Sequence, residues 1–301
     1  MIPKSKIPLI SIAFATTLTL SKLFVALYSG SLAVLSSALD SLLDILSSMV
    51  NYFALKTAEA PPDKNHPFGH GKFEALAAFI QSFIIFITGL FLLWKSVDNF
   101  ISGKHLKDVD ASVYIMVFSV FMTVILSVIL RYYAKKYNSN VILTDAMHYE
   151  IDLITNSGVL LSLFVVKFFN FHSIDYIVSF AISLYIMVSS FKLGFNVSKE
   201  LLDSEIKSSE LEVIKDALRK HDELIIDYHR IRTRKAGKTI FVDMHITICR
   251  ESTLESAHRI AMGIEKELKE SIPDIDVIIH IDPCDERNCT GKFNCSKLNR
   301  L

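Results

Sequence analysis

The sequence predicts a membrane all-α bundle of six transmembrane helices followed by a soluble, cytosolic α+β domain. Hydrophobic residues make up 51% of the 301 residues, and the mean hydropathy is +0.37. A soluble protein of this length does not need so apolar a composition, which is typical of membrane proteins. After Lys199 the sequence becomes charged and amphipathic and stays so to its end. The formal net charge is zero, and no nucleic-acid partner is expected.

Six apolar runs are long enough to cross about 30 Å of hydrocarbon. They cover Ile7–Tyr28, Leu32–Leu55, Ala75–Trp94, Val113–Tyr133, Ile151–Phe169 and Ile174–Phe195. The first run is too long for the hydrophobic region of a signal peptide, so we expect it to be retained as a helix. Residues 1–200 are therefore expected to form a six-helix domain in the lipid bilayer.

The distribution of Lys and Arg near the ends of these runs predicts the orientation of the chain. With the N-terminus inside, the inner side holds Lys4, Lys6, Lys56, Lys64, Lys72, Arg131, Lys135, Lys136, Lys192 and Lys199, and the outer side holds Lys95, Lys104, Lys107 and Lys167. The bias places both termini in the cytoplasm, in a multi-pass protein of the plasma (inner) membrane.

Two of the apolar runs carry paired acidic or imidazole side chains. Asp40 and Asp44 in the second run are four residues apart, and so are His148 and Asp152 at the start of the fifth. A spacing of four places both side chains on one face of a helix. Carboxylates are costly in a bilayer unless they face a water-filled path, pair with cations or bind an ion.

Three carboxylates and one imidazole from two helices match the four-coordinate N/O ligation that Zn²⁺ accepts. The alternative is that Asp40 lies near an interface and His148 only packs or caps. Asp145 and Glu150 are expected to face headgroups or water and are left out of the site. Asn51 and Asn156 either line the same path or form hydrogen bonds between helices.

The connection between the second and third runs reads DKNHPFGHGKFE. Asp63, His66 and His70 can converge on a metal ion because Pro67 and Gly69 bend the chain between the two histidines. We expect a more open and weaker site than the intramembrane one, with a solvated polar loop as the alternative.

The soluble part alternates between helix and strand periods. The expected elements are a helix Glu210–His221, a strand Asp227–Arg234, a turn at Ala236–Lys238, a strand Thr239–Ile248, a helix Thr253–Glu270 and a strand Asp276–Ile281. This order predicts a ferredoxin-like, metallochaperone-like fold with helices on one face of a sheet. We expect it to span residues 201–284.

Several histidines of this domain fall on neighbouring elements. The candidate ligands are His229, His245, His258, His280 and Asp282. Imidazole and carboxylate groups from adjacent elements can hold one or two Zn²⁺-like ions. For each histidine taken alone, an ordinary surface or core role is the alternative.

Residues 285–301 form a tail that contains Cys289 and Cys295, which follow Cys249 and Cys284. The spacings do not match a C-x2-C zinc motif, so we assign the tail no function. In the cytosol all four are expected to be reduced thiols.

In combination, these motifs resemble the cation diffusion facilitators, and most nearly the bacterial zinc/iron-type exporters. The resemblance rests on Asp40-x3-Asp44, NHPFGHGKFE, His148-x3-Asp152 and the closing IIHIDPC, and it extends from about Ile10 to Cys284. It implies a transport site at Asp40, Asp44, His148 and Asp152, a loop site at Asp63, His66 and His70, and a binuclear site in the soluble domain.

The resemblance further implies a homodimer in which Lys72 and Asp203 form a charge pair between the membrane and soluble parts. It implies a proton-coupled antiporter that exports Zn²⁺, Cd²⁺ or Fe²⁺, with Zn²⁺ also serving as a structural or regulatory ion. The alternative is a membrane metal sensor or scaffold that transports nothing. An enzyme is not expected, because no nucleophile motif or H-E-x-x-H sequence is present.

Overall fold

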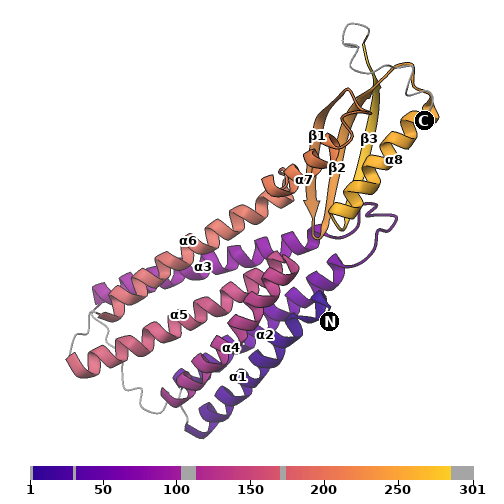
Figure 1. Cartoon of the computed structure of the whole chain (residues 1–301). Helices are drawn as coiled ribbons and strands as arrows, with labels where there is room; N and C mark the ends of the chain where they lie inside the picture. The colour runs from indigo at the N-terminus through magenta and orange to yellow at the C-terminus, as the bar shows by residue number, and fades with distance from the viewer. Residues whose placement is uncertain (1–2, 30–31, 103–112, 170–173, 286–301) are drawn as a thin grey trace. The chain divides into compact units, whose positions relative to one another are not determined.

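The structure, a computed structural model, describes residues 3–29, 32–102, 113–169 and 174–285 (Figure 1). The chain forms two compact units, Met1–Ser198 and Lys199–Leu301. The first unit holds η1 (Lys4–Lys6), α1 (Pro8–Ser29), α2 (Leu32–Ala58), α3 (Lys72–Ser102), α4 (Val113–Tyr137), α5 (Asn140–Phe169) and most of α6 (Ile174–Leu201). The second holds α7 (Ser208–Arg219), β1 (Asp227–Ala236), β2 (Thr239–Ile248), α8 (Leu254–Ser271) and β3 (Ile275–Pro283).

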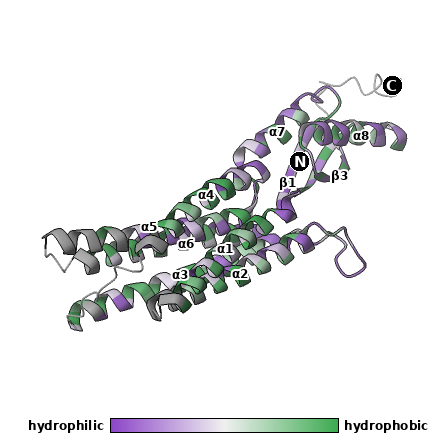
Figure 2. Ribbon diagram, turned by 90° about the horizontal axis from the view of Figure 1, so that it is seen from below, coloured by the Kyte–Doolittle hydropathy of each residue, from purple (hydrophilic) through white to green (hydrophobic). Residues whose placement is uncertain are grey.

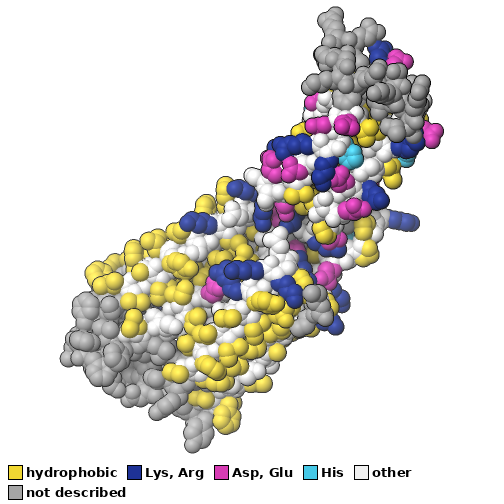
Figure 3. Space-filling model, viewed as in Figure 1, with side chains coloured by type: hydrophobic (Ala, Val, Ile, Leu, Met, Phe, Trp, Pro, Cys, Tyr) yellow, Lys and Arg dark blue, Asp and Glu magenta, His cyan; other side chains and the backbone are white. Residues whose placement is uncertain are grey.

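The long helices of the first unit expose an apolar surface. Figure 2 shows them largely in the hydrophobic colour, and hydrophobic side chains cover much of this unit in Figure 3. Leu27 is 76% exposed and Ile101 is 77% exposed. Since a soluble protein rarely exposes so extensive an apolar surface, this is the surface of a membrane protein.

Within the described residues, four helical segments are long and apolar enough to cross a membrane: Lys4–Val25, Lys72–Ser102, Val117–Tyr137 and Ile177–Leu201. They belong to α1, α3, α4 and α6. The two remaining long helices, α2 and α5, are those that carry the acidic and imidazole side chains. The described part of the first unit contains six long helices, but six membrane spans remain a prediction.

The helix α5 begins earlier than the apolar run Ile151–Phe169 indicates. The turn before it contains Asn138 with φ of 46°, and the backbone N–H of Ser139 donates to Ala134 O at 3.2 Å, which closes the end of α4. The Ser139 hydroxyl accepts from the Ile142 N–H at 3.4 Å and so caps the start of α5. The extra turns place the polar residues around His148 inside a helix.

Small residues allow α3 and α6 to pack closely and antiparallel. A Cβ atom added at Gly89 would lie 2.9 Å from Met187 Cγ and 3.3 Å from the Met187 backbone nitrogen. A Cβ atom at Gly194 would lie 2.8 Å from Ser82 Oγ. Close backbone approach at small residues is how transmembrane helices gain packing energy.

Gly89→Ala is expected to lower the free energy of unfolding by about 1–3 kcal/mol, because the added methyl group meets backbone as well as side chain. Thermal unfolding in detergent measures the change. Gly263→Ala in α8 is the matched control: there a Cβ atom would meet only His221 Cε1 at 3.8 Å. Equal unfolding temperatures in the two variants would contradict close packing at Gly89.

The second unit contains a three-stranded mixed sheet in the order β1-β2-β3. β1 pairs with β2 antiparallel and β2 pairs with β3 parallel. Gly237, with φ of 61°, opens the two-residue turn between β1 and β2. The α-β-β-α-β order is as predicted. The described residues form three strands, whereas a β-α-β-β-α-β ferredoxin-like unit has four.

The two faces of this sheet differ in burial. Along β2, buried and half-buried residues alternate without exception. The buried set faces the core with residues of α7 and α8, and includes Ile240, Val242, Met244, Ile246 and Ile248. The period of two therefore leaves His245 on the opposite, more accessible face.

Candidate metal sites

The intramembrane group consists of Asp44 from α2 and His148 and Asp152 from α5. His148 Nε2 lies 2.9 Å from Asp44 Oδ1 and 3.8 Å from Asp152 Oδ2. One ligand atom from each residue lies within 4.8 Å of the others, so a single cation could contact all three. Asp40 is in α2, but its side chain lies outside the described residues, and its role stays a prediction.

The donor set of the intramembrane group suits a transition-metal cation. The side chains are 19–35% exposed, so each is partly desolvated but still reachable. Two carboxylates close to one imidazole repel each other, and a dication would offset that repulsion. One nitrogen and several oxygens are ligands that Zn²⁺ accepts.

Asp145 differs from the sequence expectation. We expected it to face headgroups or water, but it is only 1% exposed. Its Oδ2 accepts from Ser11 Oγ at 2.7 Å, and its Oδ1 accepts from Asn51 Nδ2 at 3.0 Å. The expectation was wrong because the helix face that carries Asp145 is covered by α1 and α2. Asn51 thus forms a hydrogen bond between helices.

Glu150, the other acidic residue left out of the site, pairs with α4. Its two carboxylate oxygens accept from Arg131 Nε and Nη2 at 2.6 and 2.7 Å. Asp145 and Glu150, five positions apart on one helix, therefore have different environments. Their burial and their hydrogen-bond partners distinguish them, and the sequence reports neither.

The loop group, Asp63, His66 and His70, lies between α2 and α3. Asp63 Oδ1 accepts from the backbone N–H groups of Asn65 and His66 at 2.8 and 2.7 Å, which fixes the carboxylate in an Asx turn. Its oxygens lie 3.3 Å from His66 Nδ1 and 3.4 Å from His70 Nε2. The three residues have ligand atoms within 4.8 Å of one another.

The electrostatics of the loop group favour a charged carboxylate. The hydrogen bond from the His66 N–H lowers the pKa of Asp63 below its ordinary value. Gly69, with φ of 79°, turns the chain between the two histidines. The arrangement offers an exposed, ionised oxygen and two imidazoles to a cation, and it is more open than the intramembrane group.

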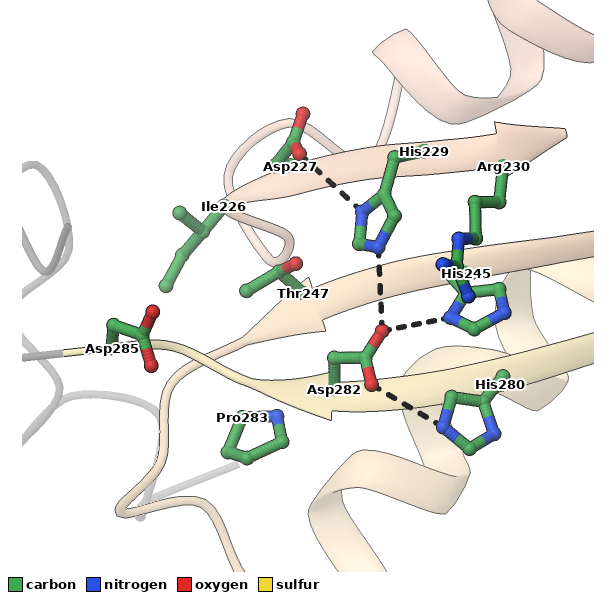
Figure 4. Close-up of a pocket in the computed structure, with 10 residues that line it drawn as sticks. All are labelled: Ile226, Asp227, His229, Arg230, His245, Thr247, His280, Asp282, Pro283 and Asp285. Atoms are coloured by element: carbon green, nitrogen blue, oxygen red, sulfur yellow. Dashed lines mark hydrogen bonds and ion pairs between the residues drawn. The ribbon is translucent and has the colours of Figure 1, made fainter.

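The sheet group is formed by histidines at matching positions on three strands. The strand register pairs His229 with His245 and His245 with His280. Figure 4 shows Asp282 at the end of β3 with the three imidazoles around it. Asp282 oxygens lie 3.5 Å from His229 Nε2, 2.9 Å from His245 Nδ1 and 3.3 Å from His280 Nε2.

Asp282 is the centre of the sheet group. The hydrogen bond with His245 is the main cause that lowers its pKa below the ordinary value, and His280 and His229 add to it. His229, His245 and Asp282 have ligand atoms within 4.8 Å of one another. A carboxylate shared by several imidazoles can hold one or two divalent ions. These residues line a pocket with Asp227 and Thr247.

Some predicted residues lie apart from these groups. His258 is exposed on α8 and belongs to none of the three within the described residues. Lys72 is in the first unit and Asp203 in the second, where Asp203 pairs with Arg234 at 3.9 Å. The Lys72–Asp203 pair stays a prediction.

Two of the four cysteines lie within the described residues. Cys284 is a buried free thiol, as expected. Cys249 is also buried, and its reduced state stays a prediction. Cys289 and Cys295 lie outside the described residues.

The sequence matches known proteins over nearly its whole length. A relative from Salmonella schwarzengrund, "Cation-efflux pump FieF", is 32% identical over 288 residues, covering 96% of this chain and 95% of the relative. The protein of the same name from Salmonella typhimurium is 32% identical over 280 residues, covering 93% of each. A solved structure, the metal-bound C-terminal domain of the CzcD transporter from Thermotoga maritima, is 30% identical, covers 26% of this chain and 94% of its own, and has a TM-score of 0.24.

Two family descriptions match consecutive parts of the chain. Residues 9–202 match "Cation efflux transmembrane domain", and residues 206–284 match "Cation efflux protein, cytoplasmic domain". Together they include all three candidate metal groups. The chain therefore belongs to the cation efflux (cation diffusion facilitator) family.

Proposed function

We propose that the chain is a secondary antiporter that exports divalent metal cations from the cytoplasm in exchange for protons. The observation that carries the proposal is the intramembrane group, in which Asp44, His148 and Asp152 meet from two helices. Such a cluster inside a bilayer is costly unless it serves an ion path. The names of the relatives, cation-efflux pumps, agree with this reading.

The chemistry of the group links metal to protons. Metal binding needs deprotonated carboxylates and a neutral imidazole, so protons and metal compete for the same lone pairs. His148 is the member whose ordinary pKa lies near neutral pH. A proton that arrives from outside would therefore weaken metal binding there, and its departure inside would restore it.

Zn²⁺ is the cation we propose first. One nitrogen among oxygens suits tetrahedral Zn²⁺ or Cd²⁺, while Fe²⁺ remains the principal competitor because selectivity also depends on geometry and availability. The loop group and the sheet group bind the same class of ion from the cytoplasmic side. They act as accessory and regulatory sites.

The proposal includes an oligomeric state, which involves the soluble domain. We propose a homodimer in the inner membrane with both termini in the cytoplasm, in which metal at the sheet group shifts the transport equilibrium. Lys72 and Asp203 are proposed to link the membrane and soluble parts. Domain boundaries are proposed at residues 1–200, 201–284 and 285–301.

A metal-competition transport assay tests the function. Purified protein is placed in liposomes that contain a metal-sensitive dye, and flux is followed with and without a pH gradient. We expect flux that depends on the gradient and a ranking of metals with Zn²⁺ or Cd²⁺ first. Metal binding without flux would instead favour a sensor or scaffold.

His148→Asp is expected to change metal choice. An all-oxygen group favours harder ions such as Mn²⁺ over Zn²⁺ and Cd²⁺. We expect inhibition of flux by Cd²⁺ to weaken by about tenfold, the effect expected when a soft-ion ligand is lost. The measurement is Cd²⁺ competition in the same liposomes, and unchanged competition would argue against His148 as a ligand.

A further inference from the structure

A fully buried carboxylate joins three helices close to the intramembrane group. Asp145 of α5 accepts a hydrogen bond from Ser11 of α1 on one oxygen and from Asn51 of α2 on the other. Ser11 is 0% exposed and Asn51 is 2% exposed, so both donors are buried. The connection depends on side chains from distant parts of the sequence.

The groups that surround Asp145 donate hydrogen bonds rather than supply lone pairs. The Ser11 hydroxyl and the Asn51 amide both point their protons at the carboxylate, and Gln81 of α3 also interacts with it. Donors of this kind stabilise a negative charge, whereas a metal site would present oxygens to the ion. The arrangement is therefore a connection between helices and not a fourth metal site.

One atom in this cluster has an unmet hydrogen-bonding demand. The side chain of Gln81 is buried, and its Oε1 has no hydrogen-bond partner among the described residues, although its Nε2 lies 3.4 Å from Ser47 Oγ. A buried acceptor without a partner costs free energy. Water that entered this region would donate a hydrogen bond to Gln81 Oε1. The closed arrangement therefore keeps the hydrogen bonds of Asp145 but leaves this Gln81 oxygen without a donor.

The cluster lies between the intramembrane group and one end of the bundle. Asp145 precedes His148 by about one helical turn, on the side where α5 begins. Next to His148, the hydroxyl group of Tyr149 lies 3.3 Å from that of Ser48 of α2, and neither residue is more than 1% exposed. The partly exposed intramembrane group is thus shut off from this end by a buried layer.

A second set of contacts closes the same end. Glu74, in the first turn of α3, forms an ion pair with Lys4 of η1 and accepts a hydrogen bond from Ser139 at the start of α5. Glu74 is 4% exposed. The start of α5, the start of α3 and the N-terminal segment therefore meet where the Asp145 cluster ends.

We propose that Asp145, with Ser11 and Asn51, is a positioning latch that holds the cytoplasmic entrance to the metal group closed. The inference rests on the proposed transport function, because a cation must pass this layer to load from the cytoplasm. Opening requires α5 to separate from α1 and α2, which breaks both hydrogen bonds. The latch thereby sets how often the entrance is open.

A weakened latch lowers both the KM and the maximal rate of transport. Apparent affinity scales with the fraction of molecules that are open to the loading side. Loss of the latch raises this fraction, so the KM for metal on the cytoplasmic side falls, while the maximal rate falls because closure becomes slow. A merely structural defect would lower the maximal rate without lowering the KM.

The latch is tested by the accessibility of a cysteine introduced as Ser48→Cys in the full chain. Membrane vesicles with residues 206–284 facing the bath are treated with an impermeant maleimide. Labelling at position 48 is quantified by peptide mass spectrometry, which separates it from the native cysteines. Losing a charge-assisted hydrogen bond is expected to raise the labelling rate about tenfold or more in Asp145→Ala.

Three further variants make the test specific. Ser11→Ala removes one hydrogen-bond donor to Asp145 and is expected to raise the labelling rate by about threefold. If Asp145→Ala does not fold, this variant tests whether the latch controls access to position 48. Asp145→Asn keeps one acceptor and should fall between wild type and Asp145→Ala. Glu150→Gln, on the same helix but paired with Arg131 at 2.6 Å, is the control and should match wild type.

Labelling in Ser11→Ala and Asp145→Asn within twofold of wild type, with wild-type flux intact, would overturn the latch. A wild-type protein that moves no metal would overturn the proposed function instead. Increased labelling together with a lower KM supports the latch.

Discussion

Asp44→Ala is expected to reduce metal flux by at least about 100-fold. Asp44 Oδ1 lies 2.9 Å from His148 Nε2, so the substitution removes a carboxylate from the centre of the intramembrane group. Loss even of an outer-shell partner lowers metal affinity or activity by about 10–100-fold, and loss of a direct ligand should exceed that. The measurement is metal flux into liposomes under a pH gradient.

Glu150→Gln is the matched control for this substitution. It also removes one carboxylate charge near the same end of α5, but Glu150 pairs with Arg131 and belongs to none of the three metal groups. We expect wild-type flux from it. Flux in Asp44→Ala as fast as in wild type would show that the cation does not pass through this group.

His245→Ala is expected to weaken metal binding at the sheet group, the site that we propose for the soluble domain. His245 lies on the central strand, paired in register with both His229 and His280, and 2.9 Å from Asp282. Its loss separates the two remaining imidazoles, so we expect metal affinity at the sheet group to fall by at least about tenfold. Metal content of the purified full chain, measured by mass spectrometry, reports the loss.

His221→Ala is the matched control, because this imidazole lies 2.9 Å from Glu267 between α7 and α8, outside the sheet group. It should leave the metal content of the soluble domain unchanged. If both variants lose the same amount of metal, the sheet group is not the binding site.

The same site predicts a pH dependence with a definite sign. The pKa of Asp282 is lowered, so its carboxylate stays ionised when the pH falls below about 3.9, the ordinary pKa of an aspartate. Its contribution to the stability of the folded state is lost only when the pH falls through the lowered pKa. Protons and metal compete for the imidazole lone pairs of the sheet group. Bound metal should therefore be released as the pH falls while Asp282 is still ionised, as a pH titration of bound metal will measure.

Much of the fold follows from periodicity. The apolar runs predicted the long helices, and the β-branched and apolar residues of Thr239–Ile248 predicted the strand β2. Spacings of four predicted that His148 and Asp152 share a helix face. Local patterns of this kind succeed because each is set by the geometry of a single element.

Relations between elements were predicted less well. The helix α5 begins at Asn140, ahead of the apolar run Ile151–Phe169, because the cap at Ser139 lies outside that run. Four helical segments meet the length and hydropathy expected of a span within the described residues, and the predicted spans in α2 and α5 include side chains that the structure does not describe. The register that aligns His229, His245 and His280 could be suspected from the strand positions but not assigned.

The sequence by itself determined the family, the three sets of candidate ligands and the order of the elements. The tertiary structure alone decided that Asp145 is buried while Glu150 faces Arg131. The physical reason is that periodicity fixes which residues share a face of one helix, but whether that face meets lipid, water or donors such as Ser11 and Asn51 depends on neighbouring helices far away in the sequence.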